Sequence, residues 1–137
     1  MTYTAEDIVA AARSCIGTKF VHQGRAPGVG LDCAGVVSHV IDSIGYSHDG
    51  PAAYGRLPFA GMLEQVLDRQ EYLRKVADMQ AGDIMLMRFV GDPQHLGVCA
   101  GETMIHAYLQ AGRCVEHQID RTWRNRIVSI YRFEAIA

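Results

Sequence analysis

Apolar residues return at helical spacing in two segments of the N-terminal half of the chain. The first, residues 4–15, can be capped by Thr4 and ends before Gly17. The second follows Asp32, whose side chain can cap a helix, and ends at Gly45. We predict a helix in each segment, with a glycine-rich loop between them. The apolar positions are Ile8, Val9 and Ala12 in the first helix and Val36, Val37, Val40, Ile41 and Ile44 in the second.

The pattern changes from helix to strand in the C-terminal half. Residues 46–61 are rich in glycine and proline and predict a long loop, and residues 62–73 predict a third helix. Helices followed by strands indicate the α+β class, with N-terminal helices packed on a C-terminal antiparallel sheet. A chain of 137 residues fits one domain, 1–137. The predicted strands are 84–90, 96–100, 103–108, 115–119 and 127–133.

Composition and charge exclude several classes of function. Hydrophobic residues make up 49% of the chain and charged residues 20%, which is typical of a globular protein. The formal net charge of −2 argues against nucleic acid as a partner. No apolar run reaches the roughly 20 residues needed to span a bilayer, so no membrane association is expected. The N-terminus lacks a basic start with an unbroken apolar stretch, so we expect synthesis in the cytoplasm without a signal peptide.

Cys33 differs from the other three cysteines in its position. It directly follows the predicted cap Asp32, in the first turn of a helix, where free N–H groups and the helix dipole favour an anion. We therefore expect a thiolate, and the same N–H groups could receive an oxyanion. The alternative is a small buried side chain, the ordinary role of a free cysteine. With no CxxC pair, no disulfide framework is expected among Cys33, Cys15, Cys99 and Cys114.

Two histidines fall on neighbouring strands of a predicted hairpin. If residues 101–102 form its turn, His95 lies opposite Tyr108 and His106 lies opposite Gly97. His95 and His106 are then diagonal neighbours on one face of the sheet, roughly 7–8 Å apart at their Cα atoms. One ring can act as a base while the other holds its second nitrogen. A register shifted by one residue would separate them, and two unrelated histidines are the alternative.

The other polar candidates have weaker patterns. His22 lies in the glycine-rich loop and is either structural or part of a substrate rim. Cys99 shares the predicted face of His95, which allows a metal site, but no HExxH or paired CxxC supports one and no metal is expected. A basic segment near the C-terminus is either a docking patch or a solvated face. Its residues are Arg121, Trp123, Arg124 and Arg126.

Several segments, taken in order, resemble a known family. The family is that of the NlpC-type cell-wall cysteine peptidases. The segments that resemble it are LDCAGVV at 31–37, GDIMLMRF at 82–89, QHLGV at 94–98 and MIHAY at 104–108. Three further segments resemble the branch of that family found in phage and prophage tail modules. They are GTKFVHQGR at 17–25, YGRLPF at 54–59 and RTWRNRIVSIYRF at 121–133. Together these segments extend over nearly the whole chain.

The resemblance implies a papain-like α+β fold, with Cys33 as the nucleophile, His95 as its base and His106 as the residue that orients His95. The implied substrate is the peptide stem of peptidoglycan, cut between D-γ-glutamate and a diamino acid, with no cofactor. The implied location is the virion tail tip, acting on the periplasmic cell wall, with other phage tail-tip proteins as partners. Candidates for substrate binding or for the oxyanion are the backbone N–H of Cys33, Phe20, His22 and Asp32.

Two positions depart from the family pattern. Phe20 stands where the family often has tyrosine, so a hydroxyl that could donate to the substrate is missing. Ala34 replaces a frequent serine, and we attach little to that change. The main alternative is therefore a tail-tip structural or assembly protein that keeps the fold with little turnover. A further alternative, a cytoplasmic thiol or metal module, predicts a bound metal or a redox-active cysteine pair.

Overall fold

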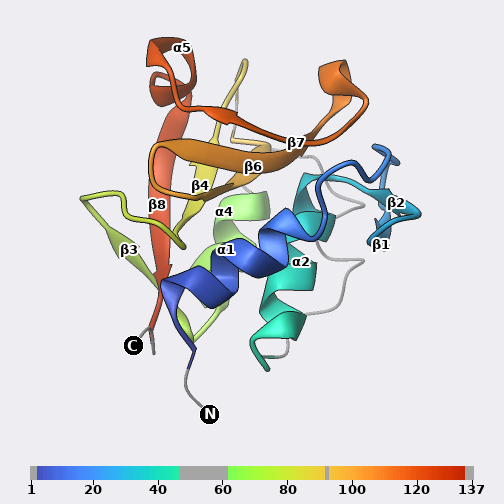
Figure 1. Cartoon of the computed structure of the whole chain (residues 1–137). Coiled ribbons are helices and arrows are strands. Elements are labelled where there is room, and N and C mark those ends of the chain that lie inside the picture. Colours follow the sequence, from blue (N-terminus) through green and yellow to red (C-terminus); the bar gives the residue numbers. More distant parts are fainter. Residues whose placement is uncertain (1–2, 47–61, 92, 135–137) are drawn as a thin grey trace.

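The computed structural model describes residues 3–46, 62–91 and 93–134 (Figure 1). The described helices are α1 (Ala5–Arg13), α2 (Cys33–Ser43), α4 (Met62–Arg69) and the short α5 (Arg121–Arg124). The strands are β1 (Arg25–Ala26), β2 (Gly30–Leu31), β3 (Leu73–Val76), β4 (Ile84–Met87), β5 (His95–Cys99), β6 (Thr103–Tyr108), β7 (Arg113–Gln118) and β8 (Ile127–Phe133). A 3-10 turn at Leu109–Ala111 joins β6 to β7.

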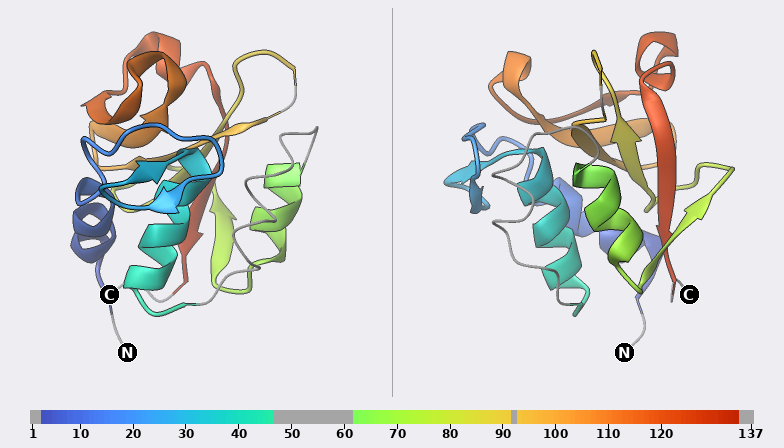
Figure 2. Two further views of the ribbon diagram at one scale, coloured as in Figure 1. Left: turned by 90° about the vertical axis from the view of Figure 1, so that its right-hand side faces the viewer. Right: turned by 180° about the vertical axis from the view of Figure 1, so that it is seen from behind.

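Six strands form one antiparallel sheet in the order β3-β8-β4-β5-β6-β7, and β1 pairs with β2 in a separate ribbon. Helices α1, α2 and α4 lie side by side on one side of the large sheet (Figure 2, left). The α+β class and the N-terminal helices packed on an antiparallel sheet are confirmed. The predicted hairpin register is also confirmed at two positions, because Val98 pairs with Ile105 and Cys99 pairs with Met104.

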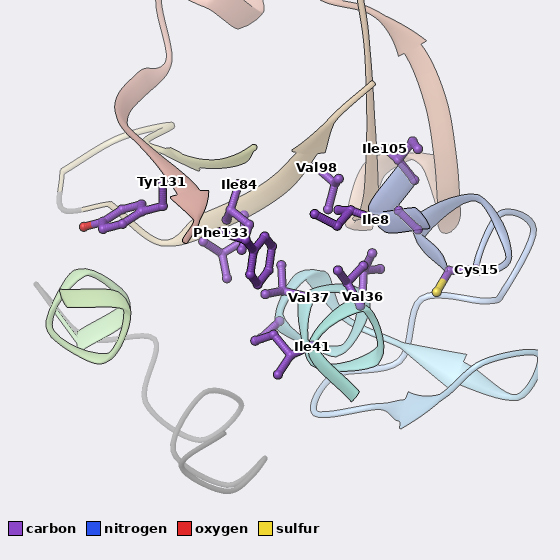
Figure 3. Packing of buried hydrophobic residues seen from close by; sticks show 14 of the residues in the cluster. Ile8, Cys15, Val36, Val37, Ile41, Ile84, Val98, Ile105, Tyr131 and Phe133 are labelled. Carbon is purple, nitrogen blue, oxygen red and sulfur yellow. The ribbon is translucent and has the colours of Figure 1, made fainter. Parts of the chain in front are cut away.

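The main core lies between these helices and the sheet. Apolar side chains of α1 and α2 meet alternate residues of β4, β5, β6 and β8, and almost all of them are fully buried. Burial of this apolar area is the principal stabilising contribution. Figure 3 shows this packing, in which the labelled side chains include Ile8, Val36, Val37, Ile41, Ile84, Val98, Ile105 and Phe133.

The two faces of the sheet bury different residues. Because side chains alternate along a strand, the residues between those of the main core face the other side. There a second cluster packs with Trp123 of α5, and His95 and His106 belong to strands that supply it. Its fully buried members are Met85, Met87, Cys99 and Met104.

The two predicted helix caps are present. Thr4 and Asp7 form a capping box at α1, since the Thr4 hydroxyl accepts from the Asp7 N–H and the Asp7 carboxylate accepts from the Thr4 N–H. The Asp32 carboxylate accepts from the Gly35 N–H at 2.8 Å and caps α2. Gly45, with φ of 92°, follows the end of α2 in the left-handed conformation that favours glycine.

Some predicted boundaries were wrong. The third helix ends at Arg69 rather than at residue 73, because Leu73 begins β3 and pairs with Phe133 of β8. The first long strand ends at Met87 rather than at residue 90, where the chain is exposed, and β7 begins at Arg113 rather than at 115. The predicted loop 46–61 lies outside the described residues apart from Tyr46.

Candidate active site

Cys33 is the first residue of α2, next to the β1–β2 ribbon (Figure 1). Its position follows from the cap, because Asp32 has extended backbone (φ −102°, ψ −174°) and the helix begins directly after it. Helix α2 also packs against β5, the strand that carries His95. The nucleophile candidate therefore lies at a helix N-terminus, where the first backbone N–H groups are free of helical partners.

Asp32 holds the loop before α2 as well as the helix itself. Its carboxylate accepts from the Gln23 N–H at 3.0 Å and from the Arg25 guanidinium at 2.7 Å, in addition to the Gly35 N–H. A side chain at Gly35 would collide with the backbone oxygen of Gly24, so only glycine allows the loop to lie this close to the helix. Asp32 lines the cavity described below, but its bonds make it a structural support of that cavity.

A cavity of ≈ 400 Å³ brings most of the predicted site residues together. Cys33 and His95 both line it, as do Phe20, His22 and Asp32. Phe20 is half-buried and offers the cavity an aromatic ring without a hydroxyl. The remaining wall is a mixture of apolar and amide side chains: Ala34, Leu63, Phe89, Gln94, Ala107, Tyr108, Leu109 and Gln110.

His95 and His106 are in direct contact. The Nε2 atom of His95 lies 2.6 Å from Nδ1 of His106, as the predicted hairpin register requires. His95 is only 6% exposed and His106 is fully buried. His106 does not line the cavity, so it can reach a substrate only through His95. Since Nε2 of His95 is occupied, Nδ1 is the nitrogen left for the thiol.

Sequence reasoning missed a third histidine that continues this contact. The Nε2 atom of His106 lies 2.8 Å from Nε2 of His117, and Nδ1 of His117 lies 2.9 Å from the backbone oxygen of Gln118. In the β6–β7 register, His117 pairs with Met104, two residues before His106, so both rings are on one face. The signal that could have found it was the alternation of β7 combined with this register.

Trp123 packs against the histidines and Arg126 packs over Trp123, so these two residues do not belong to the solvated face that was one of the two predictions. The Trp123 ring lies 4.9 Å from that of His106 and 5.1 Å from that of His117, measured between centroids. The Arg126 guanidinium lies over the rings of Trp123 and Phe89, at 4.4 and 4.8 Å. Of the basic segment, Arg121 and Arg124 are the exposed members.

The expected thiolate at Cys33 is wrong for the resting site. Burial raises the pKa of the Cys33 thiol to about 12, and the negative charge of Asp32 adds to this. Hydrogen bonds with the backbone of Leu96 and Ala34, and the charge of Arg25, act in the opposite direction but are weaker. Desolvation therefore outweighs the helix N-terminus, and the proton stays on sulfur until a base removes it.

The two buried histidines are held in the neutral form. Burial lowers the pKa of His95 to about 3, and the positive charge of Arg126 contributes. Burial lowers the pKa of His106 to about 2, with further contributions from His95, His117 and Arg126. A neutral imidazole and a neutral thiol that line the same cavity can serve as a general base and its nucleophile.

Within the ranges that the structure describes, His, Cys, Asp and Glu side chains form no group of three placed to hold a metal ion. None of the described helices has the length and apolar character to cross a bilayer.

Helices on one side of an antiparallel sheet, with a cysteine at a helix start and a histidine on a strand that line one cavity, define a papain-like α+β fold. The chain belongs to the NlpC/P60 family, whose sequence model matches residues 17–132. This establishes the family that the sequence motifs resembled.

Solved structures share this fold at low sequence identity. The NlpC/P60 domain of the peptidoglycan hydrolase SagA matches with a TM-score of 0.68 and 21% identity, over 93% of this chain and 97% of that one. An NlpC/P60 family protein from Bacillus cereus matches with a TM-score of 0.71 and 15% identity, over 98% of this chain but 41% of that one. The peptidoglycan hydrolase RipB from Mycobacterium tuberculosis matches with a TM-score of 0.66 and 17% identity, over 97% and 65%. Among curated proteins, no sequence matches the chain.

Proposed function

We propose that this protein is a peptidoglycan hydrolase, a cysteine peptidase that cuts amide bonds in stem peptides through an acyl-enzyme. The observation that carries the proposal is the cavity shared by Cys33 and His95, with His106 holding the second nitrogen of His95 at 2.6 Å. Membership of the NlpC/P60 family and the likeness to the peptidoglycan hydrolases SagA and RipB support the choice of substrate. The bond we propose is that between D-γ-glutamate and a diamino acid.

Each proton in this reaction has a donor and an acceptor. His95 takes the thiol proton at Nδ1 as the Cys33 sulfur attacks the carbonyl carbon, and the oxyanion lies at the N–H groups that begin α2. The C–N bond then breaks, the amine leaves with the proton from His95, and a thioester remains. Water attacks the thioester and gives a proton to His95. The free acid leaves as the sulfur recovers its proton.

The test is digestion of purified peptidoglycan by the protein and by Cys33→Ser, with fragments identified by mass spectrometry. We expect new amino termini at the diamino acid with the unaltered protein and none with the variant. Cleavage elsewhere in the stem would change the bond but keep the class. Equal fragment yields from both proteins would contradict the role of Cys33.

A second candidate is a structural or assembly protein that keeps the fold with little turnover. The neutral Cys33 thiol, with its pKa raised to about 12, and the missing hydroxyl at Phe20 favour this alternative. The same digestion separates the two, because a structural protein leaves peptidoglycan intact. Phe20→Tyr is then informative: a gain in turnover would attribute the low activity to the missing donor.

We propose further that the protein is part of a phage or prophage tail tip and acts on the periplasmic wall after synthesis in the host cytoplasm. The support is the resemblance of residues 17–25, 54–59 and 121–133 to the tail-module branch. Mass spectrometry of purified particles would detect the chain with tail proteins. Its absence from particles would remove the tail from the proposal and leave the chemistry unchanged.

A further inference from the structure

We propose that His117, together with the backbone carbonyl of Gln118, fixes the tautomers of His106 and His95, so that His95 presents an unprotonated Nδ1 to Cys33. His117 is a positioning residue in this role, because it acts only through the two other rings. The inference rests on the proposed function for its catalytic consequence. The arrangement of protons that it describes is a property of the folded protein alone.

The argument starts at the end of the chain of rings. The carbonyl oxygen of Gln118 can only accept a hydrogen bond, and Nδ1 of His117 lies 2.9 Å from it. Nδ1 of His117 must therefore carry the proton. In a neutral imidazole one nitrogen donates and the other accepts, so Nε2 of His117 is an acceptor. A single backbone carbonyl thus determines the tautomer of the first ring.

The same rule passes along the other two rings. Nε2 of His106 lies 2.8 Å from the acceptor Nε2 of His117, so it carries the proton and Nδ1 of His106 accepts. Nδ1 of His106 lies 2.6 Å from Nε2 of His95, so Nε2 of His95 carries the proton. The other nitrogen of His95, Nδ1, is not in contact with His106 and therefore carries a lone pair. This is the state that a base for Cys33 requires.

Because His106 is buried, its neighbouring rings determine which of its two nitrogens carries the proton. His106 is fully buried and Trp123 lies against it and against His117, with centroids 4.9 and 5.1 Å away. The ring of His106 therefore has His95 and His117 as its polar partners in the part of the chain that the structure describes. Without His117, the reversed state becomes accessible, in which Nδ1 of His106 donates and Nδ1 of His95 carries the proton. In that state His95 cannot accept a proton from the thiol.

The first test needs no variant. Long-range 1H–15N correlation of the histidine rings at pH 8, above the ordinary histidine pKa of about 6.5, reports which nitrogen carries each proton. The expected pattern is a proton on Nδ1 of His117, on Nε2 of His106 and on Nε2 of His95. A proton on Nδ1 of His95 in the unaltered protein overturns the proposal.

The variants test the consequence. His117→Phe keeps the ring but removes its nitrogens, whereas the amide of His117→Gln can still accept from His106. For His117→Phe we expect a mixture of His95 tautomers and a kcat about two- to tenfold lower, following the competent fraction, with KM unchanged. The rate of alkylation of Cys33 should fall in the same proportion. His117→Gln should restore both rates, and His39→Phe, a change on α2 where the ring meets Ser14, should alter neither.

The outcomes separate this inference from the proposed function. If His117→Phe is folded and its His95 spectrum matches the unaltered protein, the inference is overturned whatever the turnover. If the tautomers shift and alkylation slows but no stem peptide is cut by any protein, the inference stands and the proposed substrate fails. A loss of kcat in His117→Phe that His117→Gln does not restore assigns His117 a packing role and overturns the inference.

Discussion

Cys33 and His95 line one cavity, but the chain positions them by different means. The thiol is placed by neighbours in sequence, since Asp32 caps its helix and also binds Gln23 and Arg25. The imidazole is placed by strand register, because its partner His106 comes from the next strand. The thiol side depends on charge and on a helix start, whereas the histidine side is neutral and desolvated. Changes on the histidine side should therefore alter turnover and the pH dependence of stability. Changes at Asp32 should alter the free energy of unfolding and the reactivity of the Cys33 thiol.

The largest effect is expected at His95. His95→Ala removes the base, and we expect turnover on a stem peptide to fall by about 10²–10⁴-fold. Chemical shifts should show that the sheet is intact, since the side chain lies at the start of β5. Turnover within a few-fold of the unaltered protein would remove the base from the mechanism.

The next effect is expected at His106. His106→Ala leaves the His95 ring free to rotate, and a misplaced base costs about 10²-fold in turnover. His106→Asn and His106→Gln should keep more activity, because either amide can still accept from Nε2 of His95. If His106→Asn falls as far as His95→Ala, His106 exchanges protons itself and its positioning role is wrong. Rates on one defined peptide for all three variants decide this.

Stability should depend on pH through the histidine side. The pKa values of His95 and His106 are lowered by folding, so below pH 6.5 the unfolded chain binds more protons than the folded one. The stabilisation is complete above the unfolded pKa and decreases as the pH falls below it, by up to about 1.4 kcal/mol per pH unit for each histidine. Urea unfolding between pH 7 and 4.5 measures it. Glu116, whose pKa is lowered mainly by its hydrogen bond with Arg13, contributes only near the acid end of this range and below it, because its ordinary pKa is 4.5.

A matched variant tests whether the two buried histidines cause this pH dependence of stability. His106→Asn removes one of the two buried imidazoles, so the decrease in unfolding free energy with falling pH should become about half as steep. His39→Asn, at a half-buried position of α2 away from the two buried histidines, should leave the slope close to that of the unaltered protein. An unchanged slope in His106→Asn would mean that other groups cause the loss of stability in acid.

The smallest effect is expected at Asp32. Asp32→Ala removes the cap and the partner of Arg25, and we expect the free energy of unfolding to fall by about 1–3 kcal/mol. Asp32→Asn keeps an acceptor for the Gly35 N–H and should lose less. It also removes a negative charge that raises the pKa of Cys33, so iodoacetamide should alkylate Cys33 faster at pH 8. Slower alkylation in Asp32→Asn would contradict that electrostatic effect.

The same reagent provides an internal control. The other three cysteines are fully buried, whereas Cys33 is half-buried and lines the cavity. Cys33 should therefore be modified first in every folded variant, as peptide mapping would show. Modification of a buried cysteine at the same rate would indicate that the variant is unfolded. The buried cysteines are Cys15, Cys99 and Cys114.

The sequence sufficed where local chemistry or period-2 alternation decided the outcome. Thr4 and Asp32 cap their helices as predicted, and a two-residue turn gives the hairpin register that brings His95 to His106. Leu73 is the last residue of the predicted third helix, but pairing with Phe133 places it in a strand. In this case a partner far along the chain overrode the local pattern.

Other features of the site depended on contacts between distant parts of the chain, which a single sequence does not reveal. His117 joins the other histidines through the β6–β7 register, and Trp123 reaches them from a helix of four residues that was not anticipated. The charge state of Cys33 was predicted from the helix start alone. Desolvation of the thiol is a tertiary property, and it outweighs that local effect.

The close approach of Gly24 to Gly35 has a mechanical consequence. Because this contact and the bonds of Asp32 fasten the loop to the first turn of α2, we expect the loop at Gln23 and Gly24 to move little relative to the Cys33 end of the helix. Leu109 and Gln110, which also line the cavity, are exposed residues of the 3-10 turn. Amides of this turn should therefore exchange with solvent deuterium sooner than those at the start of α2.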